Sequence, residues 1–322
     1  MLKNSGHTIG IDIGGTKLSV VLADGKAALL RKIKEPTHAD KGPQYVIAKI
    51  IEMAQAILAQ SGLTVAQVSC LGVSCPGPVD PQTGAIFEPP NLPGWKDIPL
   101  KKILEERLHI PARFENDANA AALAEYYYGA GQGCHNMVYL TMSTGIGGGL
   151  ILDGRLYRGS QGMAGEVGHQ TLLPYGPLCG CGKRGCLEAL CSGTGLTRWM
   201  REEAKVQPDS LIYKLVKGDL GKLSPVVLIK AAQAGDKLAL DIWNQAGFFL
   251  GWGLANLVNV LNPDIIILGT IAIHAGELLL APTRRSLTRH VLHQIPLPPI
   301  VTAKLGDNTG DYGAIAICHM DE

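Results

Sequence analysis

The sequence predicts a two-lobed α/β protein, because strand and helix patterns alternate along a chain that is long for a single core. The chain has 322 residues, of which 46% are hydrophobic and 18% charged. This is an ordinary globular composition with ample apolar material. Two strand–turn–strand segments with glycine-rich tips occur far apart, at 7–24 and 137–154. These observations indicate two lobes, each containing a glycine-tipped hairpin.

The first hairpin has the features of a phosphate-binding turn. Its first strand, 7–13, is followed by a turn and by a second strand at 18–24. Backbone N–H groups of such a turn can face a phosphate, a hydroxyl can add a donor, and a carboxylate can hold a metal ion bound to that phosphate. The residues concerned are Asp12, Gly14, Gly15, Thr16 and Lys17. A glycine pair between strands is more often only a turn, so this motif alone leaves both interpretations open.

A second glycine run, 143–149, strengthens the phosphate interpretation. It follows the strand 137–142 and precedes the strand 150–154, and its phosphate contacts are assigned to Thr144, Gly145, Gly147 and Gly148. Two such tips resemble the paired phosphate loops of the actin-like ATPase (ribonuclease H-like) fold. That resemblance implies duplicated lobes with an active-site cleft between them that clamps a nucleotide. A Walker A motif is absent, which disfavours a P-loop fold.

The segment 166–188 contains the metal-ligand pattern H-x9-C-x-C-x4-C, formed by His169, Cys179, Cys181 and Cys186. One imidazole and three thiolates suit a structural Zn²⁺ site. The glycines between the cysteines allow the short loop to fold back on one ion. A disulfide within this loop would be strained, and the chain shows no secretion signal. The remaining alternative is a set of unrelated buried thiols.

Two carboxylates flank the metal-ligand pattern. Glu166 precedes His169 by three residues, and Glu188 follows Cys186 by two. Ordering the loop on zinc would hold both carboxylates near one another, where they could accept hydrogen bonds from a ligand rich in hydroxyl groups. We therefore predict a sugar site beside the metal loop, with solvated surface glutamates as the alternative.

The runs EVGH at 166–169, CGCG at 179–182 and GCLE at 185–188 closely resemble the signature of the ROK family of sugar kinases and repressors, and most strongly the bacterial ROK glucokinases. The resemblance implies an ATP-dependent hexose kinase that phosphorylates the 6-hydroxyl of glucose with Mg²⁺, and Asp117 as the general base. It places the sugar on Gly77, Asn91, Asn116, Asp117, Glu166, His169 and Glu188. Unaided, Asn91 would be a turn residue and Asp117 a helix N-cap.

The strand 264–269 differs from the family pattern at its end. In ROK kinases this strand usually ends in two or more glycines that accept the adenosine. Here Gly269, which we assign to the nucleotide, is followed by Thr270. A side chain therefore occupies a position suited to close approach of the backbone.

The resemblance also implies a domain division and leaves other functions open. We expect a small lobe of residues 1–117 plus a C-terminal helix at about 308–322, and a large lobe of residues 118–307. An N-acetylmannosamine kinase, a fructokinase, a broad hexokinase and a polyphosphate donor remain open. A sugar-responsive repressor is disfavoured, because too few residues precede Ile9 for a helix-turn-helix. A catalytically inactive sugar-binding module is disfavoured by the complete set of expected site residues.

Charge and cysteine usage limit the partners further. The net charge of +1 gives no reason to expect a nucleic-acid or membrane partner. No signal peptide or membrane span is recognisable. Three of the eight cysteines are assigned to zinc, and the other five have the scattered positions that a reducing compartment permits: Cys70, Cys75, Cys134, Cys191 and Cys318. We expect a cytoplasmic enzyme that binds a small sugar and a nucleotide and assembles as a homodimer or a dimer of dimers.

Overall fold

A computed structural model describes residues 6–89, 91–205 and 207–320. The chain forms two compact units. The first comprises Met1–Gln132, Arg158–Met163 and Asp307–Glu322, and the second comprises Gly133–Tyr157 and Ala164–Gly306. The first unit therefore extends past the expected boundary at residue 117 and includes the helix that follows it, which packs against the last helix of the chain.

The first unit contains a five-stranded sheet in the order β3-β2-β1-β4-β7. The strands are β1 (His7–Ile13), β2 (Lys17–Ala23), β3 (Leu29–Pro36), β4 (Val68–Cys75) and β7 (Ala112–Asn116). The first three strands are antiparallel neighbours, whereas β4 and β7 add in parallel. A two-stranded ribbon, β5 (Ala85–Ile86) with β6 (Ile98–Pro99), lies outside this sheet.

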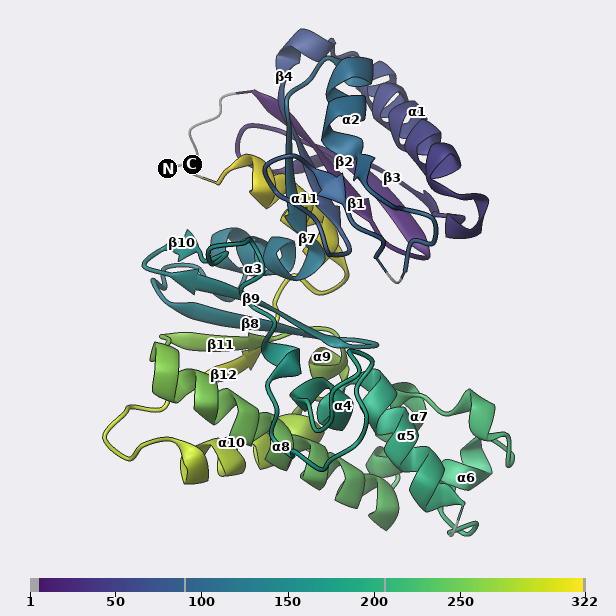
Figure 1. Ribbon diagram of the computed structural model, residues 1–322, viewed down its shortest axis with the longest axis vertical. Helices are drawn as coiled ribbons and strands as arrows, with labels where there is room; N and C mark the ends of the chain where they lie inside the picture. Colours follow the sequence, from purple (N-terminus) through teal and green to yellow (C-terminus); the bar gives the residue numbers. More distant parts are fainter. Residues whose placement is uncertain (1–5, 90, 206, 321–322) are drawn as a thin grey trace. The chain divides into compact units, whose positions relative to one another are not determined.

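Helices cover both faces of the first sheet, and the alternation of side chains along β1 explains why. Ile9, Ile11 and Ile13 point to one face and are buried with apolar residues of α1 (Pro43–Ser61) and α2 (Leu100–Leu108). On the opposite face Gly10 allows close approach of α11 (Thr309–Cys318), since a methyl group there would lie 3.0 Å from the Ala314 side chain. Figure 1 shows α1 and α11 on the two sides of the strands. The helix α3 (Asp117–Tyr128) packs against α11.

The second unit contains a sheet with the same construction, in the order β10-β9-β8-β11-β12. Its strands are β8 (Met137–Met142), β9 (Ile146–Leu152), β10 (Arg155–Leu156), β11 (Ile265–Leu268) and β12 (Ile300–Thr302). The first three are antiparallel, and β11 and β12 add in parallel, as β4 and β7 do in the first sheet. This duplicated topology confirms the predicted two-lobed actin-like ATPase fold.

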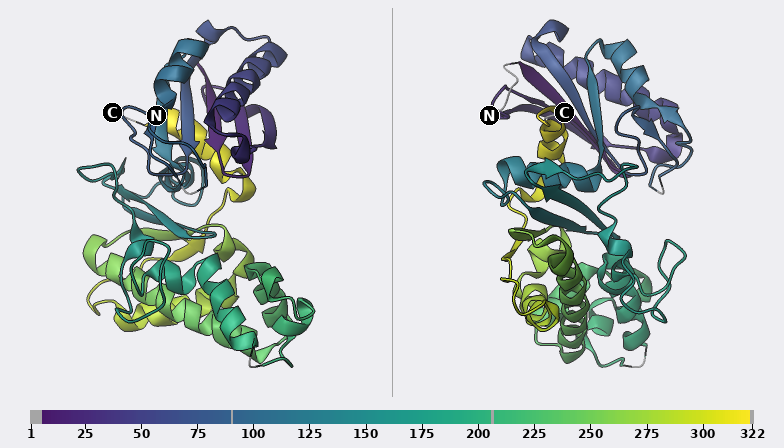
Figure 2. Two further views of the ribbon diagram at one scale, coloured as in Figure 1. Left: turned by 45° about the vertical axis from the view of Figure 1, so that its right-hand side comes forward. Right: turned by 60° about the vertical axis from the view of Figure 1, so that its left-hand side comes forward.

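The second unit is otherwise helical, and its core is built around the long helix α8. The helices are α4 (Leu187–Cys191), α5 (Gly193–Ala204), α6 (Leu211–Leu215), α7 (Pro225–Gln233), α8 (Lys237–Leu261), α9 (Ile271–Ala275) and α10 (Glu277–His290). Figure 2 shows α8 and α10 side by side. Glycines permit this approach: a methyl group at Gly251 would lie 2.3 Å from the Thr283 carbonyl oxygen. Among the described residues, no helix is long and apolar enough to cross a membrane.

The second glycine run differs from its expected extent. The strand β9 begins at Ile146, so only residues 143–145 form the tip of the hairpin. Gly147 and Gly148 lie within the strand rather than in a loop. Glycine at 148 has a packing cause, since a methyl group there would lie 2.7 Å from the Gly165 carbonyl oxygen.

Candidate functional site

The first glycine hairpin forms a closed, hydrogen-bonded tip. The Gly14 N–H donates to the Lys17 carbonyl (2.9 Å), and the Thr37 hydroxyl donates to the Gly14 carbonyl (2.6 Å). Thr16 and Lys17 are exposed at this tip. A methyl group at Gly15 would lie 2.9 Å from the Asn91 carbonyl oxygen. Asn91, predicted on the sugar, therefore lies beside the predicted phosphate turn.

Three carboxylates gather where β1 ends. Burial raises the pKa of Asp12 to about 6, and the negative charges of Asp117 and Asp311 add to the effect. A methyl group at Gly310 would lie 2.3 Å from Asp12 Oδ2, so the first turn of α11 closely approaches this carboxylate. Asp311 accepts a hydrogen bond from Ser19 (2.7 Å) and pairs with Lys32. Asp12 and Asp117 thus repel each other in the absence of a cation, which makes the pair suited to a divalent ion.

The start of α3 separates two roles that the sequence left open. Asn116 Oδ1 accepts the Asn119 N–H (2.8 Å), so Asn116 is the N-cap and Asp117 is the first helical residue. The interpretation of Asp117 as the cap is therefore wrong. A methyl group at Gly77 would lie 3.8 Å from Asn116 Cβ, so Gly77 is a neighbour of this helix start.

An ion pair that no sequence pattern predicts supports this region. Glu115 is fully buried and accepts hydrogen bonds from Arg158 Nε (2.6 Å) and Asn119 Nδ2 (2.9 Å). Arg158 belongs to a short segment that returns from the second unit's hairpin to the first unit. Local sequence gives no signal for this pairing, because the two residues are far apart in the chain.

The tip of the second hairpin is held from three sides. The Ser143 and Thr144 carbonyls accept the N–H groups of Gly193 (2.8 Å) and Thr194 (3.2 Å) at the start of α5. Glu188 Oε2 accepts the Ile146 N–H (2.9 Å). The side chains of Ser143 and Thr144 remain exposed. The tip is therefore rigid while its outer surface is available to a ligand.

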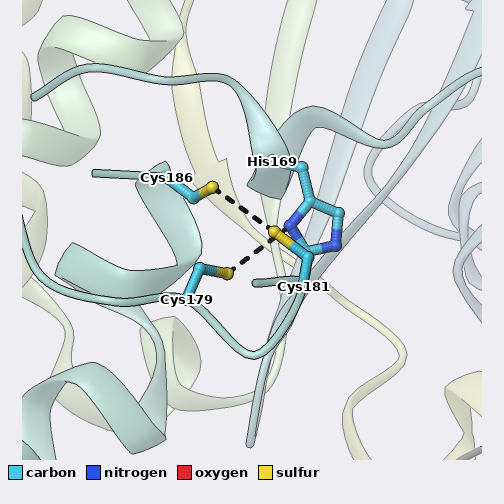
Figure 3. Close-up of side chains that lie close together, drawn as sticks. All are labelled: His169, Cys179, Cys181 and Cys186. Carbon is cyan, nitrogen blue, oxygen red and sulfur yellow. Dashed lines mark hydrogen bonds between the residues drawn. The ribbon is translucent and has the colours of Figure 1, made fainter. Parts of the chain in front are cut away.

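Four predicted metal ligands lie together in the second unit (Figure 3). The ligand atoms of His169, Cys179, Cys181 and Cys186 all lie within 4.8 Å of one another. Cys181 Sγ is 3.7 Å from Cys186 Sγ, and Cys179 Sγ is 3.7 Å from His169 Nδ1. Zn–S bonds of about 2.3 Å at tetrahedral angles separate two sulfurs by about 3.8 Å. The spacing fits one tetrahedral ion and is far too long for a disulfide.

The two nitrogens of His169 face different partners. Nδ1 lies toward Cys179 Sγ, whereas Nε2 is 3.8 Å from Glu166 Oε2. The Glu166 side chain is 58% exposed, so its carboxylate can reach a ligand. Glu188 Oε1 lies 3.4 Å from Cys179 Sγ, and Glu188 Oε2 contacts the hairpin tip. The metal cluster, the two glutamates and the second hairpin thus form one continuous group.

Gly269 directly follows the strand β11, which pairs with β8 in the second sheet. Its N–H donates to the Leu140 carbonyl (2.8 Å), and a methyl group there would lie 2.4 Å from the Tyr139 hydroxyl. Thr270 follows with φ 50°, a left-handed conformation that favours glycine.

Each unit therefore assembles its own part of the predicted site. In the first unit the structure brings together Asp12, Gly14, Gly15 and Asn91 on one side and Gly77, Asn116 and Asp117 on the other, with the Asp12 and Asp117 charges coupled. In the second unit it brings together Gly145, Glu166, His169, Glu188 and the three cysteines. The roles of these residues in catalysis and in binding sugar, nucleotide and metal remain predictions.

Comparison with known proteins gives a consistent result over the whole chain. Residues 8–321 match the ROK family. A glucokinase of Thermotoga maritima is 37% identical over 96% of both chains. A solved ROK hexokinase from Thermus thermophilus is 38% identical with a TM-score of 0.81, covering 97% of both chains. A ROK glucokinase from Streptomyces griseus, solved with glucose and AMPPNP, is 35% identical with a TM-score of 0.80, covering 96% of this chain and 98% of that one.

Regulators also resemble the chain. The xylose repressor of Bacillus subtilis is 30% identical over 98% of this chain and 77% of the repressor. Kinases and repressors with these similarities share one family and one fold. The chain belongs to the ROK family.

Proposed function

We propose that the protein is an ATP-dependent sugar kinase that transfers the γ-phosphoryl group of ATP to the 6-hydroxyl of glucose. The observation that carries the proposal is the pair of carboxylates, Asp12 and Asp117, whose negative charges repel each other in the unit that holds the first glycine turn. Phosphoryl transfer needs one carboxylate to accept the attacking hydroxyl's proton and another group to hold the metal on the phosphates. The full-length similarity to glucokinases supports the same activity.

The side chains divide the work as follows. Asp117 accepts the proton of the sugar hydroxyl, while Asn116 uses its amide to orient the sugar. Asp12 would hold Mg²⁺, which would neutralise phosphate charge. The backbone N–H groups of the two glycine turns bind the phosphates.

The sugar is gripped by Glu166, Glu188 and the Nε2 side of His169. His169 and the three cysteines would hold a structural zinc ion, and such an ion would keep these groups in place. Gly77 and Asn91 complete the sugar contacts. Glucose is the favoured substrate because the named relatives with the highest identity are glucokinases or hexokinases.

The test is an ADP-release assay with glucose, N-acetylmannosamine, mannose and fructose, and with polyphosphate in place of ATP. Wild type should turn over glucose with ATP, and Asp117→Asn should lower kcat by about 10²–10⁴-fold. Asp40→Asn, a change at an exposed aspartate of the same unit, is the matched control and should behave as wild type. Full activity in Asp117→Asn would remove this residue from the role of base.

A sugar-responsive regulator is the second candidate, favoured by the similarity to xylose repressors. It predicts sugar binding without phosphorylation. A wild-type protein that binds glucose in calorimetry but releases no ADP with any sugar would favour this candidate over the kinase.

We also propose a two-fold homodimer, the commonest soluble assembly, in the cytoplasm. All eight cysteines are free thiols in the structure, which suits a reducing compartment. Light scattering coupled to size exclusion would give the mass of the assembly.

A further inference from the structure

Thr270 adopts a backbone conformation that a β-branched residue rarely tolerates. Its φ is 50° and its ψ is −106°, directly after β11 ends at Leu268. The Cβ substituents of threonine crowd the backbone in this region, whereas glycine adopts it at no steric cost. Some interaction of the threonine side chain must therefore offset the strain.

That interaction is a pair of hydrogen bonds to one residue of the neighbouring strand. The Met142 N–H donates to Thr270 Oγ1 (2.9 Å), and the Thr270 hydroxyl donates to the Met142 carbonyl. One step earlier, the backbone itself pairs, with the Gly269 N–H donating to the Leu140 carbonyl (2.8 Å). The hydroxyl thus extends the parallel ladder between β8 and β11 at the point where the backbone of β11 turns away.

Met142 directly precedes the hairpin tip at residues 143–145. The tip's own tethers, from Gly193, Thr194 and Glu188, all act on residues 143–146. Thr270, in the loop after Gly269, adds a hydrogen-bonded contact to Met142, the last residue of β8 before the tip. One side chain therefore links the predicted phosphate turn to the predicted adenosine loop.

We propose that Thr270 is a positioning residue for the nucleotide, which sets the spacing between the loop that takes the adenosine and the turn that takes the phosphates. The proposal rests on the proposed kinase function. A nucleotide spans both elements, so their separation decides how well it binds, whereas sugar binding does not depend on it. Threonine at this position adopts a more strained backbone than glycine would, but its hydroxyl fixes the distance between the two loops.

Three variants separate the hydroxyl from the backbone conformation. Thr270→Val keeps the β-branched shape and removes the hydroxyl, so the Met142 N–H loses its acceptor, and the KM for ATP should rise about tenfold. Thr270→Ser keeps the hydroxyl and should stay within about twofold of wild type. Thr270→Gly relieves the strain but also loses the hydroxyl, so it should resemble Thr270→Val in KM for ATP. The KM for glucose should change by less than about twofold in all three.

The experiment measures both KM values and kcat, together with AMPPNP affinity by calorimetry and the Tm of each variant. A general loss of structure would raise both KM values and would not be rescued by serine. Wild-type nucleotide affinity in Thr270→Gly would overturn the proposal, since it would show that the hydroxyl has no positioning role. If Thr270→Val fails to fold, the comparison of serine with glycine still decides.

Failure of the kinase function gives a different result. If the wild type phosphorylates no sugar, the KM and kcat measurements give no information. AMPPNP calorimetry on the same variants still measures the role of Thr270. Weakened AMPPNP binding in Thr270→Gly, with binding kept in Thr270→Ser, would support the proposal independently of turnover.

Discussion

The two sheets share one strand order, but the segments inserted between equivalent strands differ greatly. Residues 37–67 lie between β3 and β4 and contain the single α-helix α1. Residues 157–264 lie between β10 and β11, and the described part of this segment contains the predicted metal ligands and five α-helices. The penultimate residue of the first strand is Asp12 in one sheet and Thr141 in the other. Equivalent backbones thus present a carboxylate in one unit and a hydroxyl in the other.

This difference indicates how chemistry is distributed over a duplicated scaffold. The glycine turns are common to both units because they depend on backbone N–H groups, which any sequence with the right turn supplies. Acid–base chemistry depends on side chains, and the residues proposed for it lie in the first unit. The second unit instead carries the four predicted metal ligands, and a bound ion would order residues that would otherwise lie in a long irregular segment. The predictions below test that division.

The largest effect is expected for Asp12→Asn. This change removes the charge near the end of β1, where the equivalent residue of β8, Thr141, is uncharged. The kcat should fall by about 10²–10⁴-fold, and the Mg²⁺ concentration for half-maximal activity should rise. Because the Asp12 carboxylate is destabilised by burial and by Asp117, its neutralisation should leave Tm unchanged or higher. Steady-state kinetics with a Mg²⁺ titration, and calorimetry for Tm, check this.

Asp40→Asn is again the control. If Asp12→Asn lost activity and Tm together, the carboxylate would be a structural group, and the proposed division of chemistry between the units would not hold.

The second prediction removes the metal from the second unit. Cys186 is fully buried, and Cys186→Ser should abolish stoichiometric zinc, lower Tm, and raise the KM for glucose about 10–100-fold. Zinc content by mass spectrometry and glucose kinetics are the measurements. Cys134→Ser, at a half-buried cysteine of the same unit outside the cluster, should leave all three unchanged. A zinc-free protein with wild-type KM for glucose would contradict a role for the metal in sugar binding.

Elements with strong local patterns could be predicted from the sequence. The strand 7–13 has its predicted limits, because its apolar pattern is a local signal. The edge strand β3 was not predicted, since its side chains are charged and mostly exposed, as edge strands often are. The short β12 likewise has too few residues for a periodic signal.

The site shows the same limit. The metal ligands are predictable because they lie close in sequence with a characteristic spacing. The Glu115–Arg158 pair and the bond from Ile146 to Glu188 depend on contacts between distant segments, which no local pattern encodes. Which nitrogen of His169 faces the cysteines could not be predicted from the sequence either, because it depends on the orientation of the ring in the fold.

The third prediction concerns the pH dependence of stability and activity that Asp12 of the first unit should cause. Because the pKa of Asp12 is raised to about 6 in the folded protein, the folded state binds more protons than the unfolded state between about pH 4 and pH 6. The contribution of Asp12 to stability is therefore present at low pH and is lost as the pH rises through about 6. Mg²⁺ needs the ionised form, so activity at low Mg²⁺ should rise through the same range.

Chemical denaturation and kcat/KM from pH 4.5 to pH 8 measure both trends. Saturating Mg²⁺ should shift the acid limb of activity to lower pH, because the cation favours the ionised carboxylate. If the acid limb of the activity profile does not move with Mg²⁺, the titrating group is not Asp12.

The smallest effect is expected at the tip of the second hairpin. A methyl group at Gly145 would lie 2.4 Å from Glu188 Oε2, so Gly145→Ala should push this carboxylate away from the Ile146 N–H. The KM for ATP should rise about threefold, in line with one weakened hydrogen bond. Gly180→Ala is the control, because no atom lies within 4 Å of a methyl group there. Because Glu188 is also proposed to contact the sugar, the KM for glucose should rise as well. A rise in the KM for glucose with no change in the KM for ATP would show that the Glu188–Ile146 hydrogen bond does not support the phosphate turn.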